Sequence, residues 1–130
     1  MKLSKSTISA AHFIESLMMY RNAVHQLHLS AKGPGSFARH MALGDLYDAM
    51  PDIIDDITEQ YQGRTHTILE YKNTCKVKDA TGKALPIAVE IRKFVDDNRE
   101  AMGEYSEIQN TIDELVSVLN KTIYKLTNLM

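Results

Sequence analysis

Two histidines and two carboxylates stand at spacings that suit a metal site. His28 and His40 lie on either side of a Gly-Pro-Gly segment. Asp55 and Glu59 follow, and their i, i+4 spacing places both carboxylates on one face of a helix, ~6 Å apart along its axis. Imidazole and carboxylate ligands together suit iron, manganese or zinc.

The same spacings exclude a shared site within one straight helix. His40 and Asp55 are fifteen residues apart, which corresponds to ~22 Å of rise along a helix. If the four side chains form one site, the histidines of one chain must meet the carboxylates of a second. A two-fold dimer with antiparallel second helices would achieve this and would generate two identical sites.

The other polar residues near this set have plainer interpretations. Three further aspartates form an acidic strip, which we interpret as a solvated helix face, with iron-entry carboxylates as the alternative: Asp48, Asp52 and Asp56. His25 stands three residues before His28 and is a candidate for orienting it. His66 is expected at the surface, and Cys75 is expected to be an ordinary loop thiol.

Four amphipathic helical segments must position these residues. The predicted ranges are 6–31, 37–70, 86–101 and 103 to the C-terminus, with a loop over 73–85. Ser6 or Thr7 is the expected N-cap of the first helix and Ser36 that of the second. Pro51 should kink the second helix, and Gly63 should weaken it. The pattern predicts an all-α, single-domain four-helix bundle over residues 1–130, with the first two helices antiparallel.

Composition narrows the class of protein. The chain has 130 residues and a formal net charge of −2, so it lacks the basic excess of most DNA-binding domains. It has no apolar run of about 18 residues that could span a membrane, and its N-terminus lacks an apolar signal-peptide core. The single cysteine suits a reducing compartment. We therefore expect a cytoplasmic protein without a membrane partner.

A known family carries the same pattern. The stretch HLSAKGPGSFARH, followed by DDITE, resembles the motif of the Dps (mini-ferritin) family: His-Trp-x-x-x-Gly-Pro, a second His twelve residues after the first, then Asp-x-x-x-Glu. The resemblance covers about residues 20–62 and implies a ferritin-like antiparallel four-helix bundle. It also implies a ferroxidase site of His28, His40, Asp55 and Glu59 at a two-fold interface, where Fe(II) is oxidised, preferably by hydrogen peroxide.

The resemblance further implies a homo-oligomer, at least a two-fold dimer and at most the dodecameric shell that stores ferric mineral and limits oxidative damage. The chain also resembles uncharacterised ferritin-like proteins of tailed bacteriophages, which would place it in the cytoplasm of a bacterium or an infected bacterial host. It departs from the family at two positions, because Leu29 replaces the tryptophan and Gly44 stands where an acidic residue is common. Only Lys2 and Lys5 precede the first helix, which gives little support to DNA binding.

These observations lead to a ferroxidase with possible iron storage as the main hypothesis, with His28, His40, Asp55 and Glu59 as both catalytic residues and metal ligands. Two alternatives stay open. One is a non-catalytic helical dimer that serves as an interaction module. The other is a structural zinc or manganese site at the dimer interface, since the ligand set does not select one metal.

Overall fold

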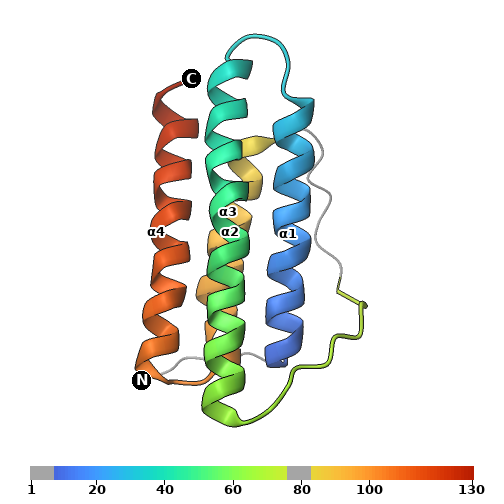
Figure 1. The fold of residues 1–130 in the computed structure, drawn as a ribbon. Coiled ribbons are helices and arrows are strands. Elements are labelled where there is room, and N and C mark those ends of the chain that lie inside the picture. The colour runs from blue at the N-terminus through green and yellow to red at the C-terminus, as the bar shows by residue number, and fades with distance from the viewer. Residues whose placement is uncertain (1–7, 76–82) are drawn as a thin grey trace.

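The computed structural model describes residues 8–75 and 83–130. The elements in these ranges are α1 (Ala10–Ser30), α2 (Ser36–Thr65), α3 (Ala84–Asn98), the 3₁₀ helix η1 (Arg99–Met102) and α4 (Ser106–Asn128). No strand occurs in the described ranges. The predicted all-α four-helix bundle is therefore confirmed (Figure 1).

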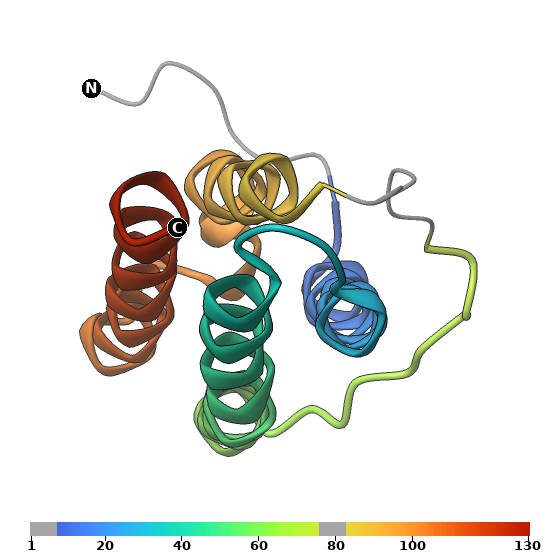
Figure 2. The same ribbon diagram turned by 90° about the horizontal axis from the view of Figure 1, so that it is seen from above.

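The order of the helices includes one long crossover. α1 and α2 are antiparallel and joined by a short turn, whereas α2 and α3 run in the same direction (Figure 1). Viewed from above, α2 lies beside α1 and α4, and α3 lies across the bundle from α2 (Figure 2). The connection between Thr65 and Ala84 therefore brings the chain back to the end where α2 begins. Ferritin-like bundles have a single long crossover of this kind.

The helices begin at different residues from those predicted. Ser9 is the N-cap of α1, and its Oγ accepts a hydrogen bond from the His12 N–H at 3.1 Å. The predicted caps Ser6 and Thr7 lie outside the described residues. Gly35, not Ser36, precedes α2, and its φ of 74° is a left-handed conformation that glycine adopts without steric cost.

The second helix ends earlier than predicted. α2 continues through Pro51 and Gly63 and ends at Thr65, not near residue 70. His66 adopts a φ of 57°, and this left-handed residue terminates the helix. The Leu69 N–H then bonds to the Gln62 side chain at 2.9 Å, not to a helical carbonyl. As predicted, His66 is exposed.

Apolar stripes from all four helices meet in one core. α3 begins at Ala84, two residues before the predicted start, and passes into η1 at its last turn. The largest fully buried side chains are Phe13, Ile14, Leu17, Leu43, Leu46, Met50, Ile57, Ile91, Met102, Ile108, Ile112 and Leu115. No helix in the described ranges is both long enough and apolar enough to cross a lipid bilayer.

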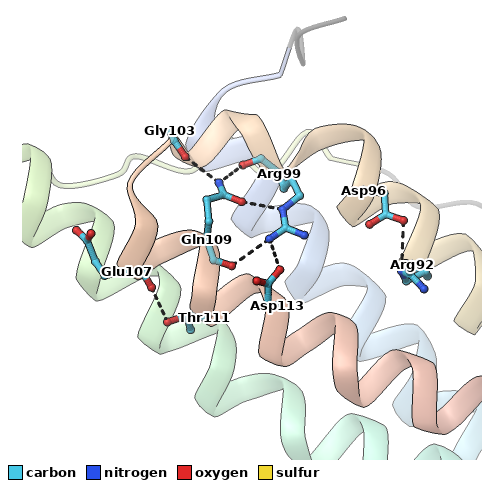
Figure 3. Close-up of polar contacts among 8 residues, drawn as sticks. All are labelled: Arg92, Asp96, Arg99, Gly103, Glu107, Gln109, Thr111 and Asp113. Carbon is cyan, nitrogen blue, oxygen red and sulfur yellow. Dashed lines mark hydrogen bonds and ion pairs between the residues drawn. The ribbon is translucent and has the colours of Figure 1, made fainter. Parts of the chain in front are cut away.

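A polar network closes the end of the bundle opposite the α1–α2 turn (Figure 3). The Arg99 guanidinium donates to the Gln109 side chain at 2.7 Å and forms an ion pair with Asp113. The Gln109 amide donates in turn to the carbonyls of Arg99 and Gly103, at 3.0 and 2.7 Å. These bonds connect η1 and its C-cap to the first turns of α4.

Cys75 lies in the loop after α2, as expected, but it is not solvent-exposed. Its side chain is buried, and its Sγ lies 2.8 Å from the Ser16 Oγ on α1. Nearby, the Tyr20 hydroxyl donates to Glu90 of α3 at 2.8 Å. Burial, followed by this hydrogen bond, raises the pKa of Tyr20. The segment after α2 is thus fixed to α1 through the buried Cys75–Ser16 contact.

Candidate metal centre

His28 and His40 meet at the end of the bundle where α1 turns into α2. His28 lies in the last turn of α1 and His40 in the second turn of α2. Their imidazole rings are stacked, with centroids 3.8 Å apart and planes inclined by 15°. The structure therefore brings together the two histidines that the sequence singled out, although they are twelve residues apart.

Two reciprocal hydrogen bonds hold the rings. Nδ1 of His28 lies 2.7 Å from the His40 carbonyl oxygen, and Nδ1 of His40 lies 2.8 Å from the His28 carbonyl oxygen. A carbonyl only accepts, so each Nδ1 must carry a proton and donate it. In the neutral rings, both Nε2 atoms then carry lone pairs. Fixing Nδ1–H on a backbone carbonyl is a common way for proteins to orient a histidine that binds metal through Nε2.

Gly44 creates the space for the His28 ring. A Cβ at position 44 would lie 2.9 Å from Cε1 and 3.1 Å from Nδ1 of His28. Such distances are too short for ordinary contact, so any larger residue would displace the imidazole. The difference from the Dps pattern at Gly44 therefore has a structural role, because a residue without a side chain lets the His28 ring lie directly against α2.

An aromatic and cationic stack continues from the histidine pair along the α1–α2 contact. The His25 ring lies on the Tyr47 ring at 4.2 Å with an interplanar angle of 8°, and Tyr47 lies 5.3 Å from His28. The Arg21 guanidinium covers the same tyrosine ring at 4.9 Å. His25 thus contacts the site indirectly through Tyr47, as its ring is 6.4 Å from that of His28.

The structure does not bring the predicted carboxylates to the histidines within one chain. Asp55 and Glu59 are both exposed and lie further along α2, ~22 Å or more from His40 along the helix axis. Asp55 borders a shallow pocket of about 220 Å³ between α1 and α2. Within the described ranges, no three histidine, cysteine or acidic side chains are grouped to hold a metal ion.

Tyr71 marks the other end of this helix face. Its pKa is raised, chiefly by burial of the phenol; a hydrogen bond with Thr58 opposes this shift, and the negative charges of Asp55 and Glu15 add to it. The segment after α2 therefore lies near the carboxylate end of the α1–α2 groove. Sequence reasoning missed Tyr47, Arg21 and the space that Gly44 provides for His28. The one available signal was the glycine itself, four residues after His40 inside a helix, where glycine is unfavourable.

Comparison with known families shows which family the chain belongs to. A family described as a family of unknown function, DUF5856, matches residues 28–126. The chain belongs to this family. The matched region starts at His28 and includes the second histidine and both carboxylates of the candidate site.

Two curated relatives resemble the DUF5856 chain over most of its length. An uncharacterised 14.6 kDa protein of Enterobacteria phage T4, from the mobD-ri intergenic region, is 28% identical over 91% of the chain and 88% of its own length. A DNA protection during starvation protein of Helicobacter pylori is 25% identical over 70% of the chain and 66% of its own length. No solved structure matches the chain significantly. The predicted relationship to Dps proteins is therefore supported only by a weak similarity.

Proposed function

We propose that this DUF5856 protein is a Dps-like iron protein that oxidises Fe(II) at sites formed between two copies of the chain. The observation that carries the proposal is the locked His28–His40 pair, in which each Nδ1 donates to a backbone carbonyl and each Nε2 of the neutral rings keeps its lone pair. The weak similarity to a DNA protection during starvation protein supports the same class of function. The four-helix bundle with one long crossover is also compatible with it.

The histidines would bind Fe(II) as a substrate through Nε2. Neutral imidazoles suit Fe(II), and the two bonds from Nδ1 hold the rings in place without involving the ligating nitrogens. Since the rings are already fixed, binding requires little loss of side-chain freedom. The same geometry suits zinc or manganese, so metal selection would depend on the remaining ligands and on supply.

The carboxylates of a second copy would complete the site. Asp55 and Glu59 are exposed one turn apart on α2, where a second chain can approach them. Their negative charge compensates the extra positive charge that oxidation creates. Two Fe(II) ions each lose one electron to hydrogen peroxide from solution, which takes up two protons and becomes two water molecules. The protein contributes positioning and charge compensation.

A subunit-mixing experiment tests both the chemistry and its location. One variant carries His28→Gln and His40→Gln, and the other carries Asp55→Asn and Glu59→Gln. Each alone should lose peroxide-dependent oxidation of Fe(II), followed by ferric absorbance after anaerobic iron loading. After unfolding and refolding together, half of the dimers contain one chain of each kind and hold one intact site, so ~25% of the wild-type rate should return.

The controls separate this proposal from its alternatives. His66→Gln removes an exposed histidine outside the site and should leave the rate unchanged. Oxidation at the rate of protein-free buffer by the wild-type chain would refute the ferroxidase and favour a helical interaction module. Tight binding of Zn²⁺ or Mn²⁺ without oxidation would indicate a structural metal site. Light scattering on the same sample would show whether the active particle is a dimer or a dodecamer.

A further inference from the structure

We propose that a second copy docks on the α1–α2 face in one register, with the two-fold axis beside Asp48 and with Met41 of each copy filling the other's pocket between α1 and α2. This inference rests on the proposed function, because that function requires the histidines of one chain to meet the carboxylates of another. It goes further by naming the contacts that select the register. These contacts lie outside the four metal ligands.

The register follows from the positions of the two halves of the site on α2. Antiparallel packing must bring His40 of one copy level with Asp55, or with the midpoint between Asp55 and Glu59, of the other. In either case the two-fold axis passes beside Asp48, which lies midway along α2 between the histidine and the carboxylates. Met41, Asp48 and Asp55 are seven residues apart, so they lie on one face of α2, and all three are exposed.

The pocket lies where this register needs it. It has a volume of about 220 Å³ and is lined by Met18, Arg21, Pro51, Ile54 and Asp55. Met41 is 48% exposed, and the register brings Met41 of a second copy level with the turn that holds Ile54 and Asp55. A flexible, unbranched methionine is well suited to fill such an irregular, partly apolar hollow. The two-fold symmetry makes this contact occur twice.

Charge at the axis also favours a second copy. Two Asp48 carboxylates would face each other there and repel. Arg21 lies at the same level, over the Tyr47 ring, and its Nε is buried without a hydrogen-bond partner among the described residues. Asp48 of a second copy is the carboxylate that the register brings near this guanidinium. Two Arg21–Asp48 contacts would thus offset the repulsion.

Large apolar side chains are exposed at both ends of the α1–α2 face. Leu29 and Phe37, near the α1–α2 turn, are 69% and 76% exposed. Met18 and Tyr71, near the carboxylate end, are also exposed. Antiparallel docking would place each apolar end of one copy against the opposite apolar end of the other. Large exposed apolar side chains of this kind are typical of interaction surfaces.

Cross-linking of single cysteines tests the register without metal. In a Cys75→Ser background, Asp48→Cys should form a disulfide-linked dimer on mild oxidation, because the two cysteines meet at the axis. Glu59→Cys, on the same helix, would be ~30 Å from its own copy along the helix axis and should stay monomeric on a non-reducing gel. Equal cross-linking of both variants, or of neither, would overturn the register. A matched urea unfolding curve for each variant shows that it is folded.

The pocket contact has its own matched pair of variants. Met41→Glu should raise the dimer dissociation constant, measured by sedimentation, at least ~10-fold. Met19→Glu changes an exposed methionine that does not line the pocket and should have little effect. Equal effects of the two variants would refute the contact. Cross-linking as expected without iron oxidation would refute only the ferroxidase. Complementing oxidation without Asp48→Cys cross-linking would refute the antiparallel docking and leave the shared site.

Discussion

Adding one methyl group at Gly44 should disturb the histidine site more than it disturbs the helix. The Cβ of Gly44→Ala would lie 2.9 Å from Cε1 of His28. Carbon atoms in contact prefer about 3.5 Å or more, so the ring must move by ~0.6 Å or the helices must separate. That movement acts directly on the 2.7 Å bond from His28 Nδ1 to the His40 carbonyl.

The expected free energies oppose each other. Alanine is more favourable than glycine inside a helix by ~1 kcal/mol, whereas overpacking costs ~1–3 kcal/mol. The free energy of unfolding of Gly44→Ala should therefore fall by ~0–2 kcal/mol. Gly63→Ala is the matched control, because it lies in the same helix with no neighbouring atom within 4 Å of the added Cβ. It should gain ~0.5–1 kcal/mol, so the difference between the two variants measures the clash.

Urea unfolding followed by circular dichroism gives this difference, and metal titration gives its effect on the site. If the hydrogen bond from His28 Nδ1 to the His40 carbonyl is distorted, the site should bind Fe(II) or Co²⁺ ~10–100-fold more weakly. The Gly63→Ala protein should bind as the wild type does. If Gly44→Ala were as stable as Gly63→Ala and kept its metal affinity, the packing of His28 against α2 described above would be wrong.

Three further predictions concern the scaffold. Leu115→Ala, at a fully buried position, should lower the free energy of unfolding by ~2–5 kcal/mol in urea. Arg99→Ala should cost ~1–3 kcal/mol, because it leaves the Gln109 side chain and carbonyl without their donor, and Arg99→Lys should recover only part of this loss in the same assay. Because the pKa of Tyr20 is raised in the folded chain, the folded chain keeps a proton that the unfolded chain releases above the ordinary tyrosine pKa of 10.0. The free energy of unfolding should therefore fall as the pH rises above 10.0. Tyr20→Phe should reduce this decline in urea titrations between pH ~9 and ~11; an unchanged slope would contradict the assignment.

Side-chain periodicity was sufficient to predict the bundle, but not the ends of its helices. The stripe of Ile108, Ile112, Leu115 and Leu119 is fully buried, as its spacing indicates. Apolar residues continue past the end of α2, so the pattern extended the helix too far. The helix ends because His66 adopts a left-handed backbone conformation, which the side-chain pattern does not indicate.

The candidate site was likewise only partly predictable from the sequence. The Gly-Pro-Gly segment predicted that the first two helices are antiparallel neighbours, and this arrangement brings His28 and His40 together. Their reciprocal bonds, and the contact of His28 with Gly44, depend on how closely α1 and α2 pack. Such tertiary distances have no signal in one sequence. The assignment of Asp55 and Glu59 as ligands stays a prediction, because it requires a second chain.

The long crossover has a consequence for how the length of the chain can vary. The eighteen residues between α2 and α3 can reach ~60 Å when extended, whereas the whole of α2 is ~45 Å long. The covalent chain therefore has more contour length than the crossing requires. Doubling a loop adds only ~0.6 kcal/mol of closure entropy, so insertions here should be inexpensive. Deletions should be tolerated less well, because removal of about four residues leaves only ~46 Å of extended chain, which barely exceeds the length of α2.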